Sequence, residues 1–171
     1  MKLFNLPNLL PLINLCCGVL ASILVISGGN IYTIFTLIII SLVADFLDGL
    51  VARAMKISSP IGKELDSLAD LISFGVAPSV LIYSMYNFSD KGLLGYFLLL
   101  IFPVAGAYRL ARYNIASFDG VFSGIPITIA GILLVIYSLG SPFIIYNQLI
   151  TYLVIILLSY LMVSKVEFKK V

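Results

Sequence analysis

Long apolar runs constrain the fold of this chain more than any other feature. Hydrophobic residues make up 61% of its 171 residues, charged residues only 11%, and the mean hydropathy is +1.16. This composition is too apolar for an ordinary soluble domain. Six runs approach the roughly 20 residues that a helical membrane span requires. They cover approximately residues 8–27, 31–55, 64–87, 92–113, 124–140 and 143–164. The sequence therefore predicts an all-α bundle of six transmembrane helices.

Residues that favour turns separate these runs. Gly, Asn, Asp and Pro gather at residues 28–30, 87–91, 118–120 and 140–142. The connections are too short to hold a second domain, and no internal repeat is visible, so we expect residues 1–171 to form a single transmembrane domain. The first run lacks a small-residue cleavage site, and we expect it to be retained as a helix.

The basic residues predict the orientation of the bundle. In a six-span arrangement only Lys91 falls on one side, and the other side carries the remaining Lys and Arg residues. These are Lys2, Arg53, Lys56, Lys63, Arg109, Arg112, Lys165, Lys169 and Lys170. Because Lys and Arg are enriched in cytoplasmic loops, we expect both termini to be cytoplasmic. No basic tract is interleaved with aromatic residues, so a nucleic-acid partner is not expected.

Four aspartates stand within the second and third runs. A charged side chain at the centre of a membrane helix costs about 2.5–3.5 kcal/mol on insertion scales, so it marks a pair or a function. Asp45 and Asp48 share one helix face, and Asp66 and Asp70 share a face of the next helix. Counted from a turn near residues 58–59, Asp48 and Asp70 lie at similar depth. The two pairs can therefore converge.

Structural ion pairing and metal binding both explain such a cluster. The nearby bases, Arg53, Lys56 and Lys63, crowd toward the cytoplasmic turn, and Asp45 lies roughly 15 Å along the helix from Met55. These bases cannot readily neutralise all four aspartates, so a divalent metal explains the cluster better than ion pairing does. Ligands that are all oxygen favour Mg²⁺, with Mn²⁺ or Ca²⁺ as substitutes. Two ions held by carboxylates are a common device for displacement at phosphorus.

Small residues accompany the aspartates on the same faces. Gly49, Ala52 and Gly62 are small enough to let a second helix or a ligand approach the helix backbone. Packing of a second helix is one reading of these residues. A flat ligand is the better one, because all three lie beside the aspartates. Arg53 can pair with a phosphate or extend to lipid headgroups.

These residues resemble a known family pattern. Asp45-x-x-Asp48-Gly49-x-x-Ala52-Arg53, eight intervening residues and Gly62-x-x-x-Asp66-x-x-x-Asp70 are similar to the motif of the CDP-alcohol phosphatidyltransferases. The resemblance implies a six-helix membrane enzyme, usually a homodimer. Such an enzyme transfers a phosphatidyl group from a CDP-linked lipid to an alcohol and releases CMP.

The same resemblance implies roles for individual residues. It implies that two divalent metals are bound by Asp45, Asp48, Asp66 and Asp70. Asp70 would also be the catalytic base that takes the proton of the acceptor. The CDP-lipid site would be lined by Asn8, Gly49, Ala52, Arg53 and Gly62.

Further segments are similar to the bacterial and archaeal branch of the family that uses serine. They are residues 7–10, Asn14-Leu15, Gly18, and residues 66–79, 109–114 and 122–126. This likeness implies CDP-diacylglycerol or CDP-archaeol as the donor, L-serine as the acceptor, and a prokaryotic cell membrane with the active site open to the cytoplasm.

The acceptor site is expected on the fourth helix. Arg109 and Arg112 lie three residues apart, and Arg recognises a carboxylate through two hydrogen bonds. They could instead anchor the helix among headgroups or pair with Asp119. Tyr113 and Ser123 are candidates for further polar contacts.

Two alternative functions stay open. One is the same reaction with another acceptor, such as glycerol phosphate or inositol phosphate. The other is a cation transporter, for which broken helices or repeat symmetry would be expected.

Overall fold

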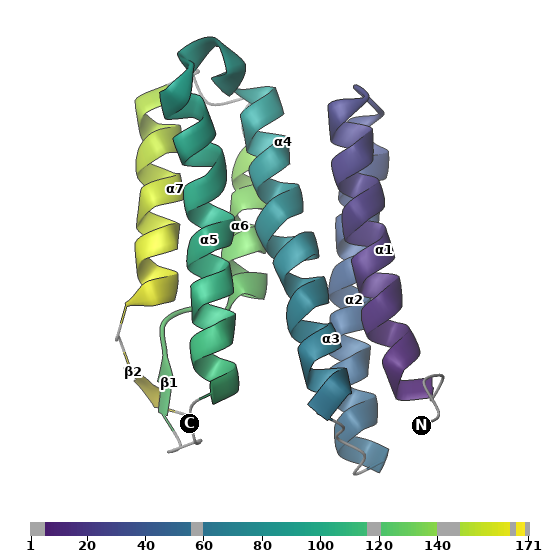
Figure 1. Cartoon of the computed structure of the whole chain (residues 1–171). Helices are drawn as coiled ribbons and strands as arrows, with labels where there is room; N and C mark the ends of the chain where they lie inside the picture. Colours follow the sequence, from purple (N-terminus) through teal and green to yellow (C-terminus); the bar gives the residue numbers. More distant parts are fainter. Residues whose placement is uncertain (1–5, 56–59, 116–120, 140–147, 165–166, 170–171) are drawn as a thin grey trace. The chain divides into compact units, whose positions relative to one another are not determined.

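The computed structural model describes residues 6–55, 60–115, 121–139, 148–164 and 167–169 (Figure 1). Its elements are α1 (Leu6–Ile26), α2 (Ile31–Met55), α3 (Pro60–Asp70), the π-helix η1 (Leu71–Val76), α4 (Ala77–Met85), the 3₁₀-helix η2 (Phe88–Lys91), α5 (Leu93–Ile115), β1 (Val121–Ser123), α6 (Ile127–Leu139), α7 (Gln148–Val163) and β2 (Glu167–Lys169). The described chain is helical apart from two short strands and the turns that connect its elements. The predicted all-α character is confirmed, and the strand pair is an addition that the sequence did not predict.

Helices long and apolar enough to cross a membrane number 4 among the described residues. They are Leu9–Ile26, Ile31–Ala54, Pro60–Met85 and Leu93–Ile115. The apolar helices Ile127–Leu139 and Gln148–Val163 are shorter. The structure thus agrees with four of the predicted spans in length and composition, and the last two spans and the cytoplasmic termini stay predictions.

Two of the predicted turns lie within the described residues. Gly28 has a φ of +68°, a conformation that glycine adopts without strain at the end of a helix. The backbone N–H of Gly29 donates to the carbonyl oxygen of Leu24 (2.7 Å), and the Asn30 side chain accepts from the backbone of Tyr32 (2.8 Å) at the start of α2. Asn87 marks the second turn with a φ of 48°. The turns predicted at 118–120 and 140–142 lie outside the described residues.

The chain forms two compact units, Met1–Ala77 and Pro78–Val171. In the first unit, α1 packs along α2 and against α3 and η1 (Figure 1). The contact between α1 and η1 is very close, because a Cβ at Gly18 would lie 2.7 Å from the Cα of Ser73. Glycine therefore sets the distance between these two helices.

In the second unit, α5 and α6 both pack against α7. Strand β1 pairs antiparallel with β2, with Val121 opposite Lys169 and Ser123 opposite Glu167. Figure 1 shows this strand pair at the end of the unit where α5 and α7 finish. The chain leaves β1 through Gly124, whose φ of +78° is suited to a tight turn.

Candidate active site

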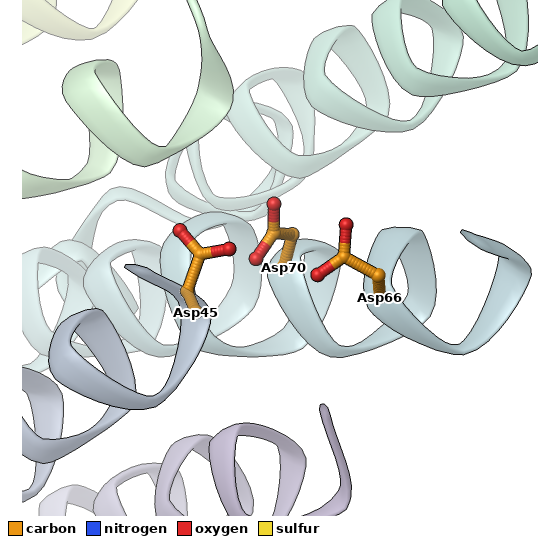
Figure 2. A group of neighbouring side chains, drawn as sticks. All are labelled: Asp45, Asp66 and Asp70. Carbon is orange, nitrogen blue, oxygen red and sulfur yellow. The ribbon is translucent and has the colours of Figure 1, made fainter. Parts of the chain in front are cut away.

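Three of the four predicted aspartates come together in the first unit. Asp45 lies on α2, whereas Asp66 and Asp70 lie on α3. One carboxylate oxygen from each residue lies within 4.8 Å of the other two. Figure 2 shows Asp66 and Asp70 one turn apart on one helix, with Asp45 beside them on another. The i, i+4 spacing predicted the neighbouring pair, and the packing of both α2 and α3 against α1 adds the third member.

These carboxylates lie in surroundings that favour a cation. Asp70 is buried, at 8% exposure, and Asp45 and Asp66 are half-buried. Like charges repel more strongly as water is excluded, because the effective dielectric constant falls. The spacing of the oxygens also fits an ion. Ligands on opposite sides of Mg²⁺ or Ca²⁺ stand about 4 to 5 Å apart, twice the usual metal–oxygen distance. The group can therefore hold a metal ion.

Asp48 is not a member of this close group. It is half-buried on α2, three residues after Asp45. Counting residues from the turn pairs Asp48 with Asp70 in depth, but the group of close oxygens contains Asp45 in its place. A count along the chain does not include the rotation of each helix about its axis. The ligand role of Asp48 stays a prediction.

Gly49 is less tightly packed than Gly18. The three heavy atoms nearest to a Cβ at Gly49 would all belong to the guanidinium of Arg53, with Nη1 and Nη2 at 3.7 Å. This is an ordinary van der Waals distance to the flexible end of a side chain. Within the described residues, helix packing therefore does not require glycine at this position. The alternative reading, a ligand that approaches the backbone, stays a prediction.

The other residues predicted for the CDP-lipid site lie in the same unit. Ala52 and Gly62 are half-buried on α2 and α3, and Arg53 is exposed at the end of α2. Asn8 belongs to α1, and its side chain lies outside the described part of the structure. The roles of these residues stay predictions.

The residues predicted to bind the acceptor all belong to the second unit. Arg109 is half-buried and Tyr113 exposed on α5, and the Ser123 side chain lies outside the described residues. Arg112 donates from Nη1 to the carbonyl oxygen of Val163 (3.0 Å) and from Nη2 to that of Ser164 (3.5 Å). Arg112 thus binds the carboxyl end of α7, an anchoring role that differs from the predicted alternatives. Asp119, the other proposed partner, lies outside the described residues.

Two features of the site were not predicted. The Asn14 side chain, which is fully buried on α1, donates to Asp70. Asn14 belongs to a segment that is similar to the serine-using branch, but that similarity assigned no role to its side chain. In addition, the π-helix η1 begins directly after Asp70, and π-helical turns occur frequently at functional sites.

Comparison with known proteins identifies the class to which this site belongs. The sequence model of the family described as CDP-alcohol phosphatidyltransferase matches residues 4–167. The chain therefore belongs to the CDP-alcohol phosphatidyltransferase family. It is an enzyme of phospholipid biosynthesis that acts on an alcohol acceptor, and its long apolar helices make it a membrane protein. Family membership confirms the predicted resemblance and argues against a cation transporter.

Particular relatives cover almost the whole chain. The CDP-diacylglycerol–serine O-phosphatidyltransferase of Bacillus subtilis (strain 168) is 38% identical over 164 residues, which is 95% of this chain and 89% of the relative. The protein of the same name in Methanocaldococcus jannaschii is 37% identical over 169 residues, 99% of this chain and 76% of the relative. Archaetidylserine synthase of Methanothermobacter thermautotrophicus is 36% identical over 169 residues, 97% of this chain and 70% of the relative.

Proposed function

We propose that this chain transfers the phosphatidyl or archaetidyl group of a CDP-linked lipid to L-serine and releases CMP. The observation that carries the chemistry is the close grouping of Asp45, Asp66 and Asp70 on two helices of a chain of this family. Serine as the acceptor is supported by the names of the bacterial and archaeal relatives. Because relatives named for diacylglycerol and for archaetidylserine are about equally similar, either ester or ether lipid suits the proposal.

The metal ligands in this proposal are Asp45, Asp48, Asp66 and Asp70. The four carboxylates hold two divalent ions, Mg²⁺ or Mn²⁺, and Ca²⁺ can occupy the same oxygen ligands. When bound, such ions neutralise charge on phosphoryl oxygens in a displacement at phosphorus. The 4.8 Å grouping supports three of these ligands, and Asp48 is included from the family resemblance.

The donor headgroup binds beside the metal ligands. Gly49, Ala52 and Gly62 leave the helix surface open to the CDP moiety, and Asn8 contributes from α1. The Arg53 guanidinium lies along Gly49, and its long exposed side chain can turn to a phosphate oxygen, which arginine binds through two donors.

Asp70 acts as the general base. Its carboxylate takes the proton of the serine hydroxyl, and the serine oxygen attacks the phosphorus next to the lipid. The bond from that phosphorus to the CMP oxygen breaks as the new P–O bond forms, and CMP leaves with the electron pair. A base positioned in this way typically contributes about 10²–10⁴-fold to the rate.

Arg109 is the preferred candidate for the serine carboxylate, with Arg112, Tyr113 and Ser123 as further candidates. Arg112 already donates to two carbonyl oxygens at the end of α7, which holds its guanidinium at that position. Arg109 is half-buried one turn earlier on the same helix.

The enzyme acts at the prokaryotic cell membrane as a single domain and as a homodimer, with its site open to the cytoplasm. The distribution of Lys and Arg supports this orientation, because only Lys91 falls on the opposite side of a six-span bundle. The lipid tails of the donor then remain in the bilayer while its polar head reaches the aspartates.

An acceptor panel tests the proposed function. Purified protein is incubated with Mg²⁺, a CDP-lipid with ester or ether chains, and one acceptor at a time: L-serine, ethanolamine, glycerol phosphate or inositol phosphate. We expect CMP release with L-serine to exceed release with every other acceptor. Faster release with a phosphorylated acceptor would reassign the substrate while leaving the family unchanged.

A further inference from the structure

Asn14 forms a direct contact with the proposed catalytic base. Its side chain, on α1, is completely buried at 0% exposure. The Nδ2 group donates a hydrogen bond to Oδ1 of Asp70, 3.2 Å away on α3. A residue far away in the sequence therefore contacts the carboxylate to which the mechanism assigns proton transfer.

Hydroxyl groups on two neighbouring helices hold the backbone of Asn14. Its carbonyl oxygen accepts from Ser41 Oγ on α2 (3.2 Å) and from Ser73 Oγ on η1 (2.8 Å). Both serines are buried at 0% exposure. The second contact depends on Gly18, because a Cβ there would overlap Ser73. Hydrogen bonds from α2 and η1 thus fix the position of Asn14 on α1.

Packing alone does not explain an amide at this position. Within the part of the chain that the structure describes, Asn14 Oδ1 is buried with no hydrogen-bond partner. A buried acceptor without a partner destabilises a fold, whereas leucine would fill a similar volume without that cost. An asparagine at this position is explained if its Nδ2 group supplies a hydrogen bond that leucine cannot make.

We propose that Asn14 is a positioning residue that fixes the rotation of the Asp70 carboxyl group. The terminal torsion of an aspartate is broad, so the carboxyl group needs a partner to select one orientation. A hydrogen bond to a carboxylate is stronger than one between neutral groups. Asn14 is itself neutral, so it orients Asp70 while leaving the negative charge that a cation and a proton require. This inference rests on the proposed role of Asp70.

Two substitutions at Asn14 test the inference, with one matched control. Asn14→Leu removes the donor and keeps the approximate volume, and Asn14→Asp keeps the shape but replaces the donor with an acceptor. Thr151→Val is the control in the second unit, because Thr151 is also 0% exposed and shares a 2.9 Å hydrogen bond with Tyr137. Each full-length protein is assayed for kcat, for the KM of the CDP-lipid, for Mn²⁺ binding by electron paramagnetic resonance without lipid, and for its thermal midpoint.

A positioning role predicts a specific pattern. In both Asn14 variants kcat should fall by about tenfold or more relative to Thr151→Val, while the KM of the donor changes by less than about threefold. The dissociation constant of Mn²⁺ should rise severalfold, because a rotated Asp70 is a poorer ligand. The inference is overturned if kcat or Mn²⁺ binding matches that of Thr151→Val, or if neither Asn14 variant yields folded protein.

An Asp70→Asn protein separates this inference from the proposed function. Wild-type turnover in Asp70→Asn would remove the base role of Asp70, and the inference about Asn14 with it. An inactive Asp70→Asn protein beside fully active Asn14 variants would overturn the role of Asn14 alone.

Discussion

At the scale of single residues, Gly18 and Gly49 show two different uses of glycine in a membrane helix. Gly18 lies against η1, where a Cβ would be 2.7 Å from the Cα of Ser73. A Cβ at Gly49 would lie 3.7 Å from the guanidinium nitrogens of Arg53, an ordinary contact distance. The first glycine serves the packing of the helices, and the second is the one proposed to contact a ligand.

Alanine substitutions should separate these two uses. Gly18→Ala should destabilise the protein by about 1–3 kcal/mol, as overpacking of a tight contact usually does. Gly49→Ala should leave the thermal midpoint nearly unchanged and raise the KM of the CDP-lipid, because the added methyl group occupies the surface proposed for the donor. Thermal unfolding and CMP release measure the two effects. A lowered thermal midpoint in Gly49→Ala with an unchanged KM of the CDP-lipid would show that Gly49 serves helix packing instead.

The aspartate group allows a test of metal binding against structural ion pairing. Asp45→Asn and Asp66→Asn should each lower turnover by more than about 100-fold, since even residues one step removed from a metal typically change activity about 10–100-fold. Without metal the same variants should be at least as stable as the wild type, because each removes one negative charge from a crowded group. A large loss of stability in metal-free buffer would instead support ion pairs. Thermal unfolding with and without Mg²⁺ measures the difference.

At the scale of elements, Arg112 connects α5 to the end of α7. Its guanidinium donates to two carbonyl oxygens, those of Val163 and Ser164. Carbonyl groups at the carboxyl end of a helix lack partners within the helix and carry partial negative charge, so a cation there stabilises the helix. This geometry distinguishes Arg112 from Arg109, although the two residues lie one turn apart on the same helix.

Replacing the two arginines one at a time should therefore have different consequences. Arg112→Ala should reduce the free energy of unfolding by about 1.5–3 kcal/mol, the usual range for hydrogen bonds to charged groups. Arg109→Ala should raise the KM of L-serine much more than that of the CDP-lipid, because it removes the proposed partner of the serine carboxylate. Equal increases in both KM values for Arg109→Ala would contradict the acceptor role. Steady-state CMP release at varied serine and varied lipid provides the comparison.

At the scale of the whole molecule, activity should depend on divalent metal. Removal of metal with EDTA should abolish CMP release, and added Mg²⁺ or Mn²⁺ should restore it, because the grouped carboxylates then regain the cation that balances their charge. Thermal unfolding of the chelated protein is the control for loss of the fold. Full turnover in excess chelator would exclude the proposed metal mechanism.

The orientation of the whole chain can be tested separately. Reporters fused at either terminus should read cytoplasmic, and a reporter near Asp90 should read external, because Lys91 alone lies on that side of the six-span arrangement. Termini on opposite sides of the membrane would mean an odd number of spans. Termini on the same side fit four spans as well as six, so a further reporter between the two shorter apolar helices, near residue 143, should read external if both helices cross the membrane.

The amino-acid sequence by itself determined the features that depend only on length and residue spacing within one helix. Apolar runs of membrane length predicted the four long helices, since chain length and hydropathy decide what can span a bilayer. The i, i+4 spacing of Asp66 and Asp70 predicted that these residues share a face, because that relation depends only on helical geometry. The family motif was equally readable, since it is a pattern along the chain.

Contacts between helices required the tertiary structure. The joining of Asp45 with Asp66 and Asp70, the hydrogen bond from Asn14 to Asp70, and the binding of Arg112 to the end of α7 each depend on how one helix is rotated and shifted against another. Those displacements follow from side-chain packing, as at Gly18 and Ser73, and residue spacing along a single helix does not contain them.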